Sequence, residues 1–274
     1  MNTEDKGIRL IATDLDGTLL HSDKEVPAGF EEWVCAHPEI RMVIASGRQY
    51  YNIKKLFPKA GDRMIYLAEN GGMVVENEKV IYANTIREED VIDCIERFQE
   101  EEGHVVILCG EKSAYMCHAT EDAERNAHMY YEKLKFVEDL RACVHEDHMI
   151  KIAVFFRDYD ADTYYRGMIK VHDRLNVVLS GDCWIDIANK EVCKGAALQF
   201  LQERYAISAD ESMAFGDYLN DESLLLQCEE SYAMNNGHPL LKEKARYIAP
   251  SNDEDGVIKV LRMIGEQLRD KTMR

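Results

Sequence analysis

Short apolar runs of strand length, each ending in a polar or glycine-containing turn, constrain the fold of this chain more than any other feature. Three of them lie in the first third, at residues 8–12, 42–45 and 64–68. Runs that are apolar throughout are typical of strands buried on both faces, as in parallel sheets. A stretch long enough for a helix, with 27–35 as the candidate, separates the first two and favours a βαβ unit.

The last third of the chain continues this alternation. Helical spacing at 194–205 precedes a short apolar strand at 213–216, and a final helix from about 254 to 268 has one apolar face. Both ends of the chain are therefore expected to build one α/β domain. We predict a doubly wound, Rossmann-like core with a mostly parallel sheet.

The middle of the chain has a different pattern, with helices predicted at 88–101, 121–134 and 161–174 and strands at 105–108, 114–116, 150–156 and 176–179. Because both ends of this region return to the same parent domain, we predict an inserted α+β cap domain. The expected core is discontinuous and comprises 1–84 and 185–274, and the expected cap is 85–184. The connector 180–189 is interpreted either as a re-entry strand or as a segment that faces the cleft.

The chain is strongly acidic, with 51 acidic and 33 basic side chains and a formal net charge of −18. Such a surface repels polyanions, so neither nucleic acid nor an anionic membrane is an expected partner. A phosphate-bearing ligand therefore requires a local site at which a metal ion and a lysine make the electrostatic potential positive.

Eight cysteines are present and no two form a CxxC pair, which excludes the usual zinc-ligand spacing and leaves free thiols in a reducing cytosol as the expectation. The N-terminal residues lack a basic start followed by an apolar run, and no stretch approaches the about 18 apolar residues of a membrane helix. We therefore expect a soluble cytoplasmic protein. Its oligomeric state stays open, with a monomer or a weak dimer as the expectation.

The strongest chemical signal is the segment DLDGTL, which begins at Asp14 directly after the first strand. Because residues i and i+2 of an extended segment share a face, Asp14 and Asp16 are expected to converge. Two carboxylates about 4 Å apart repel by roughly 4 kcal/mol at an effective dielectric of 20, so the pair needs a cation or a shared proton. The alternative is an ordinary strand-end turn, in which Asp and Gly are common.

The second signal is GDYLND at 216–221, again directly after an apolar strand. Asp217 and Asp221 carry the oxygen donors that Mg²⁺ prefers, and a short turn can bring them close to the first pair. Asn220 or Asp221 also suits a helix N-cap, and that role can coexist with metal binding.

Two further segments offer positive or hydrogen-bonding groups. Ser46, Gly47 and Arg48 follow the second strand, where a hydroxyl and adjacent N–H groups form an anion site; the alternative is a plain N-cap. Lys194 opens a helix and would alone be interpreted as a solvated lysine. Because a phosphate site needs positive charge, both segments become candidates.

Together these segments resemble the haloacid dehalogenase (HAD) superfamily of phosphohydrolases, and most closely its Cof-type subfamily, which carries a large α+β (type II) cap after the third core strand. The resemblance is carried by DLDGTLLHSDKEVP (14–27), ASGR (45–48), ENGG (69–72), CKGAAL (193–198), GDYLND (216–221), AMNNGHPLLKEKA (233–245) and SNDEDGV (251–257). The cap matches by length and position alone. Asn236 departs from the family, which often has a glycine-asparagine pair there.

The resemblance implies a phosphatase that hydrolyses a small-molecule phosphate monoester, with a sugar phosphate favoured, through an aspartyl-phosphate. Asp14 would be the nucleophile, and Asp16 would protonate the leaving alkoxide and then activate water. Mg²⁺ would be bound by Asp14, the main-chain carbonyl of Asp16, and Asp217. Asp221 would contribute through a water or by orienting Lys194.

The remaining implied roles concern the phosphate and the rest of the substrate. Ser46, Lys194 and Asn220 would hold the transferring oxygens. Gly47, Arg48 and Asn70 are further substrate-binding candidates at the rim.

Three rival interpretations remain. A phosphomutase would use the same nucleophile but return the phosphoryl group, so its product would be an isomerised sugar phosphate. A non-catalytic phosphate sensor would have no need of a nucleophile such as Asp14. A phosphonate hydrolase would need a Schiff-base lysine in the cap, and none is identified.

Overall fold

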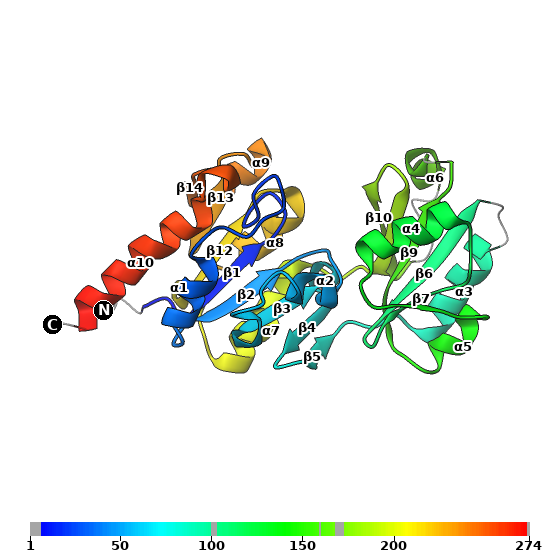
Figure 1. Ribbon diagram of the computed structural model, residues 1–274, viewed down its shortest axis with the longest axis horizontal. Coiled ribbons are helices and arrows are strands. Elements are labelled where there is room, and N and C mark those ends of the chain that lie inside the picture. Colours follow the sequence, from blue (N-terminus) through cyan, green and yellow to red (C-terminus); the bar gives the residue numbers. More distant parts are fainter. Residues whose placement is uncertain (1–6, 100–102, 159, 168–172, 273–274) are drawn as a thin grey trace. The chain divides into compact units, whose positions relative to one another are not determined.

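The computed structural model describes residues 7–99, 103–158, 160–167 and 173–272 (Figure 1). These residues form two compact units. The first, the core unit, contains the described residues up to Tyr82 together with those from Cys193 onward. The second, the cap unit, is the inserted segment Ala83–Val192.

The described part of the core unit contains an eight-stranded sheet in the order β14-β13-β12-β1-β2-β3-β4-β5. The strands are β1 (Leu10–Asp14), β2 (Arg41–Ala45), β3 (Met64–Ala68), β4 (Met73–Glu76), β5 (Lys79–Ala83), β12 (Ser212–Gly216), β13 (Glu230–Met234) and β14 (Tyr247–Ala249). The six strands from β14 to β3 are mutually parallel, and β4 is antiparallel to β3. The predicted mostly parallel core sheet is therefore confirmed.

Helices pack on this sheet and bury its strands. They are α1 (Phe30–Ala36), α2 (Tyr50–Lys54), α7 (Lys194–Tyr205), α8 (Glu222–Leu225), α9 (Pro239–Lys242) and α10 (Gly256–Thr272). Leu198 and Leu201 of α7 join Leu10 and Ala12 of β1 in one apolar cluster, which buries one face of that strand. No helix in the described ranges is long and apolar enough to cross a lipid bilayer.

The cap unit contains a second sheet, with the described order β10-β11-β9-β6-β7-β8. Its strands are β6 (His104–Gly110), β7 (Ala114–Met116), β8 (Leu134–Phe136), β9 (Met149–Phe156), β10 (Leu175–Gly181) and β11 (Trp184–Asn189), and its helices are α3 (Glu88–Gln99), α4 (Glu121–Tyr130), α5 (Leu140–Val144) and α6 (Ala161–Gly167). The neighbours are antiparallel except β7 and β8, which are parallel. Parts of two predicted helices, residues 100–101 and 168–172, lie outside the described residues.

The second boundary of the cap unit differs from the predicted one. The sequence placed residues from 185 onward in the core, but β11 pairs with both β9 and β10 and extends the cap sheet. Ile185 and Ile187 of this strand are fully buried in the cap's apolar cluster, so burial holds the strand there. The chain returns to the core only at Cys193.

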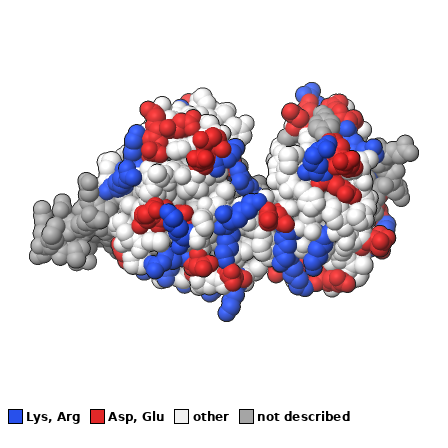
Figure 2. Space-filling view, viewed as in Figure 1, with Lys and Arg blue, Asp and Glu red and all other residues white. Residues whose placement is uncertain are grey.

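Charge is mixed over the visible surface. Figure 2 shows lysine and arginine side chains lying among aspartate and glutamate side chains, although acidic residues outnumber basic ones in the whole sequence. Against this mixed background, Asp16 of the core unit stands out because two cations contact its carboxylate, as described below.

Two neighbouring valines of β10 test the packing of the cap. Val177 belongs to the buried cluster, whereas Val178 is 49% exposed. We expect Val177→Ala to lower the free energy of unfolding by about 1–3 kcal/mol, because it removes buried methyl groups and leaves a cavity. Val178→Ala, the same change on the same strand, should cost less than about 0.5 kcal/mol. Urea unfolding followed by circular dichroism measures both, and equal losses would contradict the assigned faces of β10.

Candidate active site

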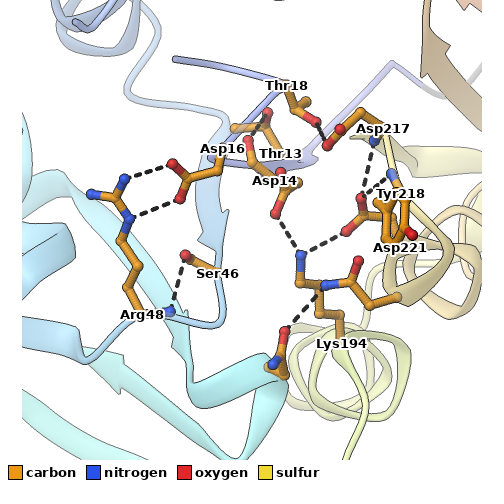
Figure 3. Close-up of polar contacts among 12 residues, drawn as sticks. Thr13, Asp14, Asp16, Thr18, Ser46, Arg48, Lys194, Asp217, Tyr218 and Asp221 are labelled. Atoms are coloured by element: carbon orange, nitrogen blue, oxygen red, sulfur yellow. Dashed lines mark hydrogen bonds and ion pairs between the residues drawn. The ribbon is translucent and has the colours of Figure 1, made fainter. Parts of the chain in front are cut away.

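Three parallel strands of the core sheet end side by side and bring distant segments together. Asp14 is the last residue of β1 and is in register with Ala45, after which Ser46 follows β2. On the other side of β1, Thr13 is in register with Phe215, two residues before Asp217. Because the carboxyl ends of parallel strands share one edge, these residues meet there, as Figure 3 shows for several of them.

Lys194 lies at the centre of this edge. Its Nζ donates hydrogen bonds to Asp14 Oδ1 at 2.5 Å and to Asp221 Oδ1 at 2.6 Å, and its side chain is 1% exposed (Figure 3). Burial opposes the charge of the lysine, but the two carboxylates outweigh it and raise the pKa of Lys194 above its ordinary value. The lysine is therefore a fixed cation between two aspartates.

The backbone around Lys194 permits this close approach. A Cβ on Gly195 would lie 2.3 Å from the carbonyl oxygen of Ser223, so α7 can approach α8 only with glycine at this position. Ser223 Oγ also accepts a hydrogen bond from the Gly195 N–H at 3.1 Å. These contacts hold the first turn of α7 against the turn that carries Asp221.

Asp221 fixes the turn after β12 as well as the lysine. Its Oδ2 accepts hydrogen bonds from the N–H groups of Asp217 and Tyr218, both at 3.0 Å. A Cβ on Gly216 would lie 2.4 Å from the Cβ of Asp221, which leaves room for glycine alone. The two oxygens of Asp221 are thus divided between the backbone and Lys194.

Asp217 connects this turn to the first motif. Thr18 Oγ1 donates a hydrogen bond to Asp217 Oδ1 at 2.9 Å. Gly17 has a φ of 81°, and a Cβ there would lie 2.5 Å from Asp217 Oδ2. Burial raises the pKa of Asp217 although the Thr18 hydroxyl opposes this shift. The positive φ of Gly17 favours glycine, and the absence of a Cβ leaves room for the Asp217 carboxylate.

Asp14, Asp217 and Asp221 form a cluster suited to a divalent cation. Each offers one carboxylate oxygen, and these oxygens lie within 4.8 Å of one another. Three carboxylates surround one lysine, which leaves an excess of two negative charges if all are ionised. Burial, followed by the charge of Asp221, raises the pKa of Asp14 well above its ordinary value. A hard cation with oxygen ligands would balance this charge, so the residues fit such an ion.

Asp16 does not converge with Asp14, which corrects the prediction from strand alternation. Its carboxylate turns to Arg48, whose Nε donates to Oδ2 at 2.8 Å and whose Nη2 donates to Oδ1 at 2.6 Å (Figure 3). Strand β1 ends at Asp14, so the alternation of an extended chain no longer applies two residues later. Burial raises the pKa of Asp16, but hydrogen bonds from Arg48 and Lys24 outweigh it and bring the pKa below its ordinary value.

The other predicted contacts lie around the turn after β2. Ser46 Oγ accepts a hydrogen bond from the Arg48 N–H at 3.2 Å, and the Ser46 carbonyl accepts one from the Asn70 N–H at 2.9 Å. The Asn70 side chain packs at Gly47, where a Cβ would lie 3.0 Å from its amide nitrogen. Asn220 Nδ2 donates to Asn70 Oδ1 at 3.2 Å. Ser46, Arg48, Asn70 and Asn220 are therefore linked by hydrogen bonds into a rim, against which Gly47 packs.

Comparison with known proteins places this site in a family. A family model of haloacid dehalogenase-like hydrolases matches residues 11–261. This chain belongs to that family. It is 31% identical over 261 residues to the 5-amino-6-(5-phospho-D-ribitylamino)uracil phosphatase YbjI of Escherichia coli (strain K12), covering 93% of this chain and 95% of the relative.

Solved structures agree with this assignment. The crystal structure of TM0651 from Thermotoga maritima has a TM-score of 0.84 and 25% identity, with 93% of this chain and 97% of that one covered. The HAD subclass IIB sugar phosphatase BT4131 has the same fold, with a TM-score of 0.72 at 22% identity over 94% of this chain and 99% of that one. The chain is a Cof-type HAD hydrolase and a phosphoric monoester hydrolase.

Some residues of this HAD hydrolase's site were not singled out from the sequence. Thr18 lies within the first motif, so its position was a usable signal, whereas nothing in the sequence pointed to the contact of Lys24 with Asp16. Asn236 was interpreted as a departure from the family pattern. In the structure its Nδ2 donates to the Gly17 carbonyl at 2.7 Å, and its Oδ1 accepts from the Asn252 N–H at 3.1 Å. It therefore supports the turn of the first motif.

The charge excess of the carboxylate cluster predicts a cation-dependent stability. We expect a divalent cation at about 100 times its Kd to stabilise the folded protein by about 2.7 kcal/mol, seen as a higher melting temperature. Asp217→Asn should lose most of this shift, because it removes one charge from the cluster. Asp62→Asn, an exposed aspartate in the same unit, is the matched control and should keep it. An unchanged shift in Asp217→Asn would rule out the cluster as the cation site.

Proposed function

We propose that the protein hydrolyses small-molecule phosphate monoesters in two steps, with Mg²⁺ bound and with Asp14 as the nucleophile. The observation that carries the proposal is the buried contact of Asp14 with Lys194 beside Asp217 and Asp221. The contact with the buried Lys194 fixes the orientation of the Asp14 carboxylate, and the neighbouring carboxylates of Asp217 and Asp221 suit a hard cation. A protein that only bound phosphate would have no use for such a carboxylate.

In the first step, a carboxylate oxygen of Asp14 attacks phosphorus, and the bond from phosphorus to the ester oxygen breaks. Asp16 acts here in its protonated form and gives to the departing alkoxide the proton that it gained from water in the preceding turnover. In the second step, water attacks the phosphorus of the aspartyl-phosphate while Asp16 takes up a proton from that water. Inorganic phosphate leaves and the Asp14 carboxylate is restored, so one difficult displacement becomes two easier ones.

The cation would be held by Asp14, Asp217 and the main-chain carbonyl of Asp16. When bound, Mg²⁺ supplies positive charge that stabilises the negative charge on the transferring oxygens. We assign Asp221 an indirect role, because Lys194 and two backbone N–H groups already use its oxygens. It would fix the lysine and the turn, or reach the cation through a water.

The transferring oxygens would be held by Ser46, Lys194 and Asn220. Phosphoryl transfer depends mainly on positioning and charge stabilisation, which these side chains can provide. Arg48 and Asn70 would contact the substrate because hydrogen bonds link them to Ser46 and Asn220, and Gly47 would do so because it packs against Asn70.

For the substrate, we propose a phosphorylated sugar or sugar alcohol. The E. coli relative is named for a compound whose phosphate sits on a D-ribityl chain, and BT4131 is named as a sugar phosphatase. Both names describe a phosphate on a polyhydroxylated carbon chain. The phosphorylated ribitylaminouracil is the second candidate, favoured by the identity of 31% to that relative.

Replacement of the nucleophile provides the direct test. We expect Asp14→Asn to lower phosphate release by at least about 10³-fold, because an amide of the same shape cannot form the aspartyl-phosphate. Chelation of Mg²⁺ should abolish release by the wild type, and added Mg²⁺ should restore it. Asp62→Asn should behave as wild type. A folded Asp14→Asn protein with more than a few per cent of wild-type turnover would refute the assigned nucleophile.

A panel of phosphate esters tests the substrate class. We expect kcat/KM for phosphorylated sugars and sugar alcohols to exceed that for nucleoside monophosphates by at least about tenfold, because each hydroxyl bonded in the site contributes about 0.5–1.5 kcal/mol. Inorganic phosphate should form in the same amount as ester is consumed. Isomerised ester without phosphate release would instead support a phosphomutase, and a preference for nucleotides would exclude the proposed class.

A further inference from the structure

A second lysine reaches the site from a loop of the core unit. Lys24 Nζ donates a hydrogen bond to Asp16 Oδ1 at 2.9 Å, the same oxygen that Arg48 Nη2 contacts at 2.6 Å. Arg48 Nε contacts the other oxygen, Oδ2. Two cations therefore hold one carboxylate, in a chain whose net charge is −18.

The backbone of Lys24 is unusual. It closes a tight turn in which the Lys24 N–H donates to the His21 carbonyl at 2.9 Å and the His21 N–H donates to the Glu25 carbonyl at 3.1 Å. Lys24 has a φ of 71°, in the left-handed region. A non-glycine residue there costs about 1–2 kcal/mol, and such strain persists where the surrounding structure enforces it. Glycine or asparagine would suit this backbone better than lysine does.

Residues from the far end of the chain fasten this turn. The N–H and the hydroxyl of Ser22 each donate to the Asp253 carboxylate at 2.7 Å. His21 Nε2 lies 2.9 Å from Asp255 Oδ1, and Asn252 Nδ2 donates to the Leu20 carbonyl at 2.9 Å. The turn that carries Lys24 is therefore held at several points by the segment before α10.

An ordinary exposed ion pair is the simpler explanation, and the same unit offers one for comparison. Lys59 Nζ lies 2.8 Å from Glu32 Oε1, and both side chains are largely exposed. Exposed pairs of this kind contribute about 0–1 kcal/mol and have no further consequence. The Lys24 pair differs because its carboxylate is also bound by Arg48 and its turn is anchored to Asp253.

We propose that Lys24 is a positioning residue for Asp16, holding that carboxylate together with Arg48 in the orientation from which it exchanges a proton with the leaving group. An aspartate on a half-exposed turn would otherwise populate several rotamers. Arg48 fixes the plane of the carboxylate, and Lys24 holds it from a separately anchored turn. This inference rests on the proposed role of Asp16 as the acid and base.

The test compares two substrates that differ in their need for a proton. The departing alkoxide of an alkyl phosphate must be protonated, whereas p-nitrophenolate leaves p-nitrophenyl phosphate without a proton. Because hydrolysis of the aspartyl-phosphate is common to both substrates, the quantity compared is kcat/KM, which reports the steps up to departure of the leaving group. We expect Lys24→Met to lower kcat/KM by about tenfold for a sugar phosphate and by less than about threefold for p-nitrophenyl phosphate. Lys24→Arg, which keeps a cation, should recover most of the loss. Lys59→Met is the matched control and should leave both rates unchanged.

A second variant separates the ammonium from the turn. Lys24→Gly also removes the cation but relieves the backbone strain, so it should show the same dependence on the leaving group. Equal losses on both substrates, or no loss on either, would overturn the inference, as would failure of Lys24→Arg to recover activity. Asp14→Asn run in parallel distinguishes the causes: if it stays active, the proposed function itself fails. If it is inactive while Lys24→Met matches Lys59→Met, only the role of Lys24 fails.

Discussion

The buried contact of one lysine with two aspartates is the interaction on which the rest of the core unit depends. An ammonium taken out of water costs several kcal/mol unless opposite charges meet it, so Lys194 is tolerated only because Asp14 and Asp221 are in place. Asp14 is placed by the end of β1, and Asp221 by its hydrogen bonds to the turn after β12. The parallel sheet thus fixes the positions of three charged residues that lie up to 207 residues apart in the sequence, from Asp14 to Asp221.

Close backbone approaches follow from this arrangement. Gly71 has a φ of 92°, and a Cβ there would lie 2.4 Å from the carbonyl of Cys193, directly before the lysine. Gly195 and Gly216 are restricted by Ser223 and Asp221 in a similar way. The charged centre is therefore surrounded by glycines because the segments around it must lie closer than any side chain allows. Their conformational freedom matters less here than their small size.

Sequence patterns predicted most elements of both units but missed β4 and β5 of the core and two short elements of the cap. The strands at 42–45 and 64–68 were predicted because these runs are apolar throughout and end in turns, and β2 and β3 lie there. β8 and α5 have three and five residues, too few to give a clear period, and neither was predicted. β11 was placed in the core because its alternation of apolar and polar residues does not say which sheet it joins. That choice depends on pairing with β9 and β10.

The candidate site shows the same limit. The carboxylates of two motifs and the lysine could be named from residue type and from their position after strands. The partner of Asp16 could not, because it depends on where the chain turns after β1 and on a loop fastened by Asp253 and Asp255. Contacts between segments more than 200 residues apart leave no local pattern in the sequence.

The return of the chain from the cap has a consequence for how such proteins diverge. The core unit resumes at Cys193, and the very next residue is the buried lysine. A recombination event that exchanged one inserted domain for another would have to keep its downstream junction ahead of Cys193. A junction only a few residues later would replace the lysine itself. The exit point of the insert is thus tied to a single position in the core unit.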